Sequence, residues 1–492
     1  MDSKRLSRRQ MLKFLGMGAA GAALAACQPK TVIVKETVVV EKEKEVTKVV
    51  KQVVKETVVV EGTPKVVEKE VTRVIEKVAT PVPEEITLAV WNIWGGSRVP
   101  LMDDMFKRFS EVHPGLTVEN VLVPGGERLQ KIQTAIAGGA PPDVPMINQQ
   151  EVPMFASRKS LLPLDSYMAL EGIDYDEYYD YAIQASQWEG KTYTLPNVSA
   201  AYSLYFYNVG HFEEVGLDPA APPETWDELI EASKKLTVIE GDQIKRLGYQ
   251  FYHGLPGPND FKQALLSNGG MYLSADGRTI EFNSSEGVAA LEWLLQVMRE
   301  AYGSVETYQE WTAVQGSEDI TNPFISETLS AKYGGVWEIF YIAEGNPDLN
   351  YLLGLLPHSL EGESHGPAEG SWSYGIPTEA PHPDAAWELV EWLSHEPTAS
   401  CWFMQQQGRP SPLKACNEDP YYYDTFPTTW PTVVKMVDTA VRIPLTPANP
   451  EIEQRMTQAL EEAAYGVKTP AEALEWAAEE GQALLDEVWA NL

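Results

Sequence analysis

Tryptophan, amide and acidic side chains stand in the loops that follow several predicted strands. A sugar presents flat C–H faces ringed by hydroxyl groups, so proteins bind it with aromatic platforms and planar polar side chains. The chain has 14 tryptophans, and several of them lie in these loops. The pattern predicts a binding site suited to a carbohydrate, with the candidate residues Trp91, Trp94, Gln149, Gln150, Glu151, Tyr202, Asn259, Asp260, Trp337, Trp372 and Arg409.

Core packing is the alternative for each tryptophan of this set. It applies most to Trp91, which strand residues flank. Trp337 follows Gly334 and Gly335, and two glycines allow a backbone to approach closely. Trp293, Trp387 and Trp392 lie on amphipathic segments, so we assign them to the core.

No catalytic motif accompanies these residues. The sequence lacks the Gly-x-Ser-x-Gly, His-Glu-x-x-His, Walker and dinucleotide-binding patterns. We therefore predict a binding protein with no catalytic residue and no cofactor, and not an enzyme. A glycosidase also combines tryptophans with paired acids. Among 71 acidic residues such pairs carry no information, so this alternative stays open.

The cysteines and tyrosines give little support for a metal site. No Cys-x-x-Cys or His-x-x-x-His spacing occurs. The runs Tyr421–Tyr423 and Tyr178–Tyr179 have the residue type of a ferric-ion site, but Asp, Glu and Pro around them indicate surface loops. We predict no bound metal. Cys401 and Cys416 either form a disulfide in an oxidising compartment or remain two buried thiols.

The N-terminus has the features of an export signal. A basic segment with Arg8 and Arg9 precedes the apolar run 14–26, which is too short to span a bilayer. Residues 7–13 resemble a twin-arginine signal, and residues 24–27 resemble a lipobox ending at Cys27. We predict a signal peptide over residues 1–27. Lipidation of Cys27 would anchor the exported protein to the outer face of the cytoplasmic membrane.

Residues 28–84 form a low-complexity spacer. The segment consists almost wholly of Val, Lys, Glu and Thr, and it repeats Lys-Glu-Thr-Val-Val-Val-Glu at residues 35 and 55. Without aromatic residues it cannot build a packed core. Valines at alternating steps of four and three permit a short coiled coil, and runs of valine equally suit strands. A charged linker without fixed structure is the third possibility.

The rest of the chain alternates strands and helices. Period-2 and period-3.6 patterns predict a strand at 86–93, a helix at 101–112, a strand at 116–123, a helix at 129–136 and a strand at 144–147. This order is typical of an α/β sheet with crossover helices, and ligands bind beyond the carboxyl ends of its strands. Capping boxes at Thr225 and Thr469 predict two later helices.

An ordered set of short segments resembles extracellular solute-binding protein family 1, the maltose- and glycerol-3-phosphate-binding type. The segments include residues 86–92, 109–118, 138–144, 207–217, 225–229, 334–337 and 408–411. The resemblance implies an α/β, two-lobed periplasmic-binding-protein fold of type II-like topology, with hinge crossovers and a ligand cleft between the lobes. The implied N-lobe is 85–197 plus 357–408, and the implied C-lobe is 198–356 plus 409–492.

The resemblance also implies a function. The protein would bind a solute and deliver it to the permease of an ABC importer, whose ATPase is cytoplasmic, with a monomeric globular part. The sequence departs from its sugar-binding relatives at Trp94-Gly95-Gly96, where they often carry charged residues. The identity of the ligand is therefore not carried over.

The charged residues of the chain limit the chemical class of its ligand. The formal net charge of −33 argues against nucleic acid as a partner. On the candidate loops, Arg98 and Arg409 face Glu151, Asp260 and Glu338, which leaves no surplus of positive charge. This balance predicts an uncharged oligosaccharide. A polyamine, sn-glycerol 3-phosphate and ferric ion remain as alternative ligands.

Overall fold

The computed structural model describes two units of the chain. In residues 1–84 it describes the backbone of 37–38, 49–60 and 63–74. In residues 85–492 it describes all but 200–202, 242, 253, 317–318, 365 and 369–370. The predicted signal peptide, Cys27 and Tyr202 lie outside the described residues. Within the described part of the chain, no helix has both the length and the apolar character needed to cross a membrane.

The spacer forms strands where it is described. Strand β2 (Val49–Val60) pairs antiparallel with β3 (Thr63–Val74) from Val49 opposite Val74 to Val60 opposite Thr63. Strand β1 (Thr37–Val38) pairs with the middle of β2. Valine and threonine favour strands because their branched side chains suit a pleated surface. The coiled-coil alternative is therefore wrong for residues 49–60 and 63–74.

The first sheet of residues 85–492 has the order β5-β4-β6-β16-β9. Strand β4 (Ile86–Asn92) lies parallel to β5 (Leu116–Leu122) and β6 (Val144–Asn148). The crossover helices are α1 (Val99–Val112) and α2 (Gly125–Ala137). The predicted strand–helix–strand–helix–strand order is confirmed, with boundaries within a few residues. Strand β16 (Trp372–Gly375) joins antiparallel beside β6 and carries β9 (Thr194–Pro196) at the edge.

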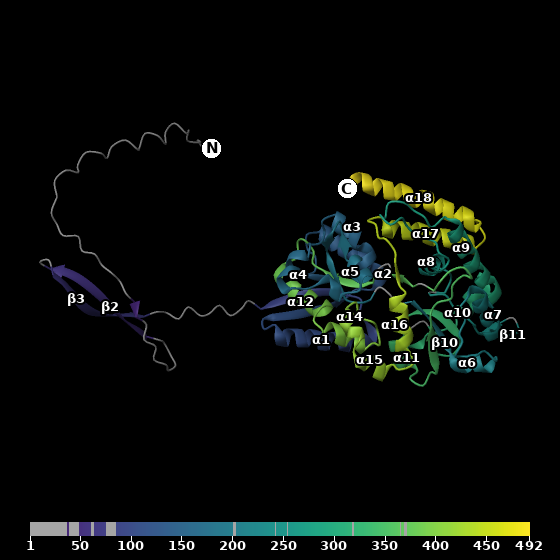
Figure 1. Cartoon of the computed structure of the whole chain (residues 1–492), viewed down its shortest axis with the longest axis horizontal. Coiled ribbons are helices and arrows are strands. Elements are labelled where there is room, and N and C mark those ends of the chain that lie inside the picture. The colour runs from purple at the N-terminus through teal and green to yellow at the C-terminus, as the bar shows by residue number, and fades with distance from the viewer. Residues whose placement is uncertain are drawn as a thin grey trace, which may run out of the picture. The chain divides into compact units, whose positions relative to one another are not determined.

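Helices from distant parts of the chain pack on this first sheet. They include α4 (Asp165–Glu171), α5 (Asp180–Gln184), α12 (Pro383–Ser394), α13 (Ser400–Gln405) and α14 (Lys414–Asn417). Trp387 and Trp392 on α12 are buried in the core beneath the sheet, as predicted. Within residues 85–492, Figure 1 shows α1, α4, α5, α12 and α14 together on one side.

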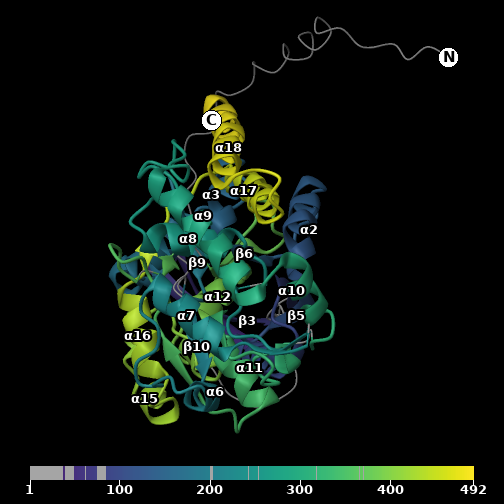
Figure 2. The same ribbon diagram turned by 90° about the vertical axis from the view of Figure 1, so that its right-hand side faces the viewer.

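The second sheet is antiparallel and belongs to a larger core. Strand β10 (Ser203–Asn208) lies between β13 (Ala331–Gly335) and β14 (Tyr351–Gly354). Around it lie α6 (Val209–Glu214), α7 (Trp226–Leu236), α8 (Pro258–Ser267), α9 (Ser285–Val297), α10 (Val305–Thr312), α11 (Glu338–Gly345), α15 (Pro420–Thr425), α16 (Trp430–Asp438), α17 (Asn449–Ala464) and α18 (Pro470–Asn491). Figure 2 turns these helices toward the viewer.

The two predicted capping boxes are confirmed. Thr225 opens α7 with Glu228, and Thr469 opens α18 with Glu472, each through reciprocal side-chain and backbone hydrogen bonds. Trp293 on α9 is buried in the larger core and stacks on Trp226, as the amphipathic pattern predicts.

Each of these two sheets has its own hydrophobic core, so residues 85–492 form two lobes. Contacts of two segments suggest that the chain passes between the lobes at later residues than the sequence implied. His358 and Ser359 hydrogen-bond to Glu224 and Ser267, which belong with the larger core. Leu413 and Cys416 are buried in the core of the first sheet. We propose that the second N-lobe segment runs from about residue 371 to 417, in place of 357–408.

Candidate ligand-binding site

The two tryptophans at the end of β4 lie in different cores. Trp94 is 2% exposed and packs edge-on against Phe403, with its backbone N–H donating to Asn92 Oδ1 at 2.7 Å. Trp91 is half-buried against the small apolar cluster that includes Ile132 and Ile147. Core packing therefore accounts for Trp91, and the structure does not bring it to the other candidates.

The side chain of Gln149, just after β6, hydrogen-bonds to α5 and to the residue that precedes β16. Its amide nitrogen donates to Ala182 O and to Ser186 Oγ, both at 2.7 Å. Its amide oxygen accepts from the backbone N–H of Ser371 at 2.9 Å, just before β16. The side chain is fully buried and its polar atoms are all used. Gln149 therefore positions the loop, while the neighbouring Gln150 is only half-buried.

Glu151 joins Trp372 through a buried arginine. Arg128 on α2 donates to Glu151 Oε1 at 2.5 Å and to Met146 O at 3.1 Å. Its guanidinium carbon lies 4.9 Å from the centre of the half-buried Trp372 ring. Burial raises the pKa of Glu151, and the charge of Arg128 opposes that shift. The arginine thus lies against the indole ring and forms an ion pair with the acid.

Asp260 serves the backbone of its own loop. Its two carboxylate oxygens accept from the N–H groups of Tyr252 and Gly257, each at 2.9 Å, at the start of α8. The side chain is buried, and this burial raises the pKa of Asp260 to about 7. Asn259, one residue earlier, is half-buried. Of this predicted pair, only Asn259 is free of a capping role.

Trp337 stands at the N-terminus of α11, half-buried, with Tyr252 edge-on at 5.8 Å. A Cβ at Gly335 would lie 2.1 Å from its ring, so the glycine makes room for this indole. The predicted close approach is therefore to Trp337 itself. The adjacent Glu338 bonds Lys332 Nζ at 2.7 Å and Asn322 Nδ2 at 3.2 Å.

A cluster of two arginines and several aromatic rings connects the two cores. The guanidinium carbons of Arg98 and Arg409 each lie 5.3 Å from the centre of the Trp94 ring. Arg409 also lies 5.5 Å from the Trp337 ring. Arg98 donates to Gln407 Oε1 at 2.9 Å and to Tyr341 Oη at 2.7 Å. The structure thus brings together Trp94, Trp337 and Arg409 from the predicted set.

Sequence reasoning counted Arg98 among the cations of the candidate loops without naming it as a binding residue, and it missed Arg128, Tyr252, Tyr341 and Gln407. Two signals were present. Arg98 is the only cation of the loop after the first strand, and Tyr341 stands one helical turn after Trp337. Nothing local marks Arg128, whose role depends on a partner 23 residues later.

Two of the tyrosines considered for a ferric-ion site fill hydrophobic cores. Tyr422 is buried, stacks on Trp430 at 3.7 Å and donates to Arg409 O at 2.6 Å. Tyr178 is buried as well and bonds His395 Nδ1 at 3.1 Å. Their placement in exposed loops, expected from the surrounding residues, is wrong for these two because both rings fill cores.

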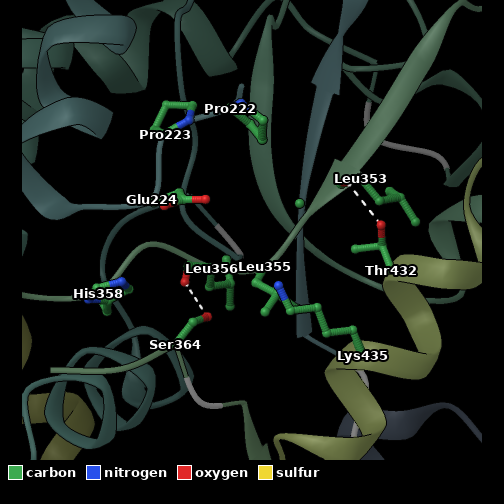
Figure 3. Close-up of a pocket in the computed structure, with 11 residues that line it drawn as sticks. Pro222, Pro223, Glu224, Leu353, Leu355, Leu356, His358, Ser364, Thr432 and Lys435 are labelled. Atoms are coloured by element: carbon green, nitrogen blue, oxygen red, sulfur yellow. Dashed lines mark hydrogen bonds between the residues drawn. The ribbon is translucent and has the colours of Figure 1, made fainter. Parts of the chain in front are cut away.

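Several surface cavities lie away from the ten candidate residues that the structure describes. One, of about 300 Å³, lies against the end of β14 and is lined by Pro222, Pro223, Glu224, Leu353, Gly354, Leu355, Leu356, His358, Ser364, Thr432 and Lys435 (Figure 3). Another, of about 660 Å³, lies beside Trp402 and the disulfide that joins Cys401 to Cys416. The predicted site is thus defined by side-chain contacts and not by these cavities.

Comparison with known proteins gives a consistent result. The family model described as bacterial extracellular solute-binding protein matches residues 95–398. The sn-glycerol-3-phosphate-binding periplasmic protein UgpB of Salmonella typhimurium is 24% identical over 431 residues, which cover 81% of this chain and 92% of that protein.

Solved structures share the fold. An ABC transporter solute-binding protein of Thermotoga lettingae, bound with α-D-tagatose, is 25% identical at a TM-score of 0.69 and covers 81% of this chain and 99% of its own. Maltose-bound MalE3 of T. maritima is 21% identical at a TM-score of 0.70, with the same coverage. The two-lobed fold predicted from the sequence is confirmed.

Proposed function

Because this chain belongs to the bacterial extracellular solute-binding protein family, we propose that it binds a carbohydrate between its lobes and delivers it to an ABC permease. One observation in particular supports a carbohydrate as the ligand. Two half-exposed indoles, Trp337 and Trp372, are each supported by a buried guanidinium, Arg409 and Arg128. An indole held in this way offers a rigid apolar face to a sugar ring.

The proposal treats the protein as a carrier and not as a catalyst. Its family consists of binding proteins, and the acids of the candidate site are engaged in fixed contacts. Glu151 pairs with Arg128, Asp260 caps a helix and Glu338 pairs with Lys332. Incubation with saccharides that the protein binds should leave them uncleaved.

The direct test is calorimetry after bound solute has been stripped by mild unfolding. Neutral di- and trisaccharides, sn-glycerol 3-phosphate and spermidine would be titrated separately, and native mass spectrometry would identify any solute that copurifies. Binding of a saccharide or a sugar derivative supports the proposal. Binding of spermidine with none for any saccharide, acidic or neutral, would overturn it.

Replacing Trp372 or Trp337 by alanine should weaken saccharide binding by about 1–3 kcal/mol each, because a stacking platform in a desolvated site is lost. Calorimetric dissociation constants measure the effect. Trp402 offers a matched control, since its ring lies 4.0 Å from the Arg108 guanidinium but outside the candidate site. Trp402→Ala should leave the affinity unchanged; an equal loss in all three variants would contradict the platform assignment.

We further propose that Cys27 carries a lipid anchor after export. The lipobox at 24–27 behind the twin-arginine segment motivates this. Cys27→Ser should move exported protein from the membrane pellet to the soluble fraction, as followed by fractionation and immunoblotting. A variant that stays in the pellet as completely as the wild type would show that another feature holds the protein there.

A further inference from the structure

Arg409 is a buried cation without a partner among the residues that the structure describes. Its side chain is 2% exposed, and its Nε atom is buried with no hydrogen-bond acceptor. Its surroundings are the rings of Trp94 and Trp337. A buried charge is costly unless an opposite charge or a hydrogen-bonding partner compensates it. Aromatic rings alone supply only part of that compensation.

The charge around Arg409 is positive. Burial, and next to it the charge of Arg98, lowers the pKa of Arg409 to about 9, while the groups that oppose this shift are tyrosines and not carboxylates. Arg98 is itself 7% exposed and donates hydrogen bonds to an amide and a phenol, those of Gln407 and Tyr341. Two guanidinium groups therefore share one aromatic cluster, and no acid of the described residues lies at hydrogen-bond distance from either.

The acids counted against these arginines in the sequence are used elsewhere. Glu151 is bonded to Arg128, Asp260 accepts two backbone N–H groups and Glu338 is bonded to Lys332. These acids therefore do not neutralise Arg98 and Arg409 in the folded protein, because each acid has another partner. Arg98 and Arg409 are left without a carboxylate partner among the described residues.

We propose that Arg409, with Arg98 beside it, binds a carboxylate or phosphate group carried by the ligand. The inference rests on the proposed function and narrows it: the solute is an acidic sugar or polyol derivative. A guanidinium presents a planar fork of N–H donors that matches the oxygens of either anion. The aromatic rings around it exclude water, which strengthens the attraction.

A stability measurement without ligand tests the premise. Arg409→Met keeps an unbranched apolar side chain like the arginine stem and removes the charged group, so the unfolding midpoint in urea should stay the same or rise. Arg128→Met is the matched comparison, because Arg128 is equally buried but paired, and that variant should unfold at lower urea. If Arg409→Met is destabilised as strongly as Arg128→Met, Arg409 is a structural cation and the inference is overturned.

A binding measurement tests the ligand class. The full-length protein would be titrated with two matched pairs: trigalacturonate against neutral trigalactose, and sn-glycerol 3-phosphate against glycerol. At least one acidic member should bind roughly 30-fold more tightly than its neutral counterpart, and Arg409→Met should abolish this preference. Arg409→Lys should retain part of it. The pair that shows the preference distinguishes a carboxylate from a phosphate.

The two proposals fail in different ways. If the neutral sugars bind as tightly as the acidic ones, the carbohydrate function stands and this inference is overturned. If no saccharide or polyol binds, the carbohydrate function fails, and inorganic phosphate becomes the probe for the anion site. Phosphate should then raise the melting temperature of the wild type and not of Arg409→Met; equal behaviour of the two proteins overturns the inference.

Discussion

Replacing Glu151 by alanine is expected to lower the free energy of unfolding by about 3–5 kcal/mol. The carboxylate is the partner of Arg128, whose side chain is 3% exposed and has no other acid at salt-bridge distance among the described residues. Removing it leaves a guanidinium charge buried beside Trp372. Urea denaturation followed by circular dichroism gives the loss, which should appear without any ligand present.

The control for this prediction lies on the same helix as Arg128. Glu127 bonds Lys131 at 2.7 Å, but both side chains are well exposed to solvent, so Glu127→Ala should leave the free energy of unfolding nearly unchanged. The double change Arg128→Met with Glu151→Leu should recover most of the stability lost in Glu151→Ala, because no charge is then left buried. If Glu151→Ala is as stable as the wild type and only binds ligand more weakly, the residue is a ligand contact, as the sequence suggested.

Regular structure was the part of this fold most accessible from the sequence. The apolar periods over 86–147 predicted three parallel strands and two helices, because each period reports which face of an element is buried. The capping boxes fixed the starts of α7 and α18 for an equally local reason. The proposed shift of the lobe boundaries rests on residues 358–364 and 413–417, whose contacts are with segments far away in the chain.

The residues of the candidate site were less accessible from the sequence than the helices and strands. Residue type and loop position selected Trp94, Trp337 and Arg409, and the structure places these three side chains in one cluster. The same criteria selected Gln149 and Asp260, whose polar atoms are instead consumed by backbone groups of neighbouring loops. A polar residue in a cleft loop and one that holds the loop have the same sequence signature. Only the hydrogen-bond partners separate them.

Removing the disulfide between Cys401 and Cys416 is expected to lower the free energy of unfolding by about 3 kcal/mol. The two residues are 15 positions apart, with their Cα atoms 5.4 Å from each other, and the bond closes this loop in the unfolded chain. The loop carries Gln407 and Arg409, so its restriction also limits the disorder of the arginine cluster in partly unfolded states. Urea denaturation of Cys401→Ser with Cys416→Ser, compared with the wild type, measures the loss.

Treatment with a reductant distinguishes the effect of losing the disulfide from the effect of the two serine substitutions. The disulfide borders an open surface cavity with Trp402 and Lys414, so a small thiol reaches it in the folded protein. Reduced wild type should therefore match the double serine variant, and the variant itself should not respond to reductant. A wild type that keeps its full stability after confirmed reduction would show that loop closure contributes nothing here. Since such bonds persist in oxidising compartments, the predicted gain in stability requires that the protein be exported, as the proposed N-terminal signal implies.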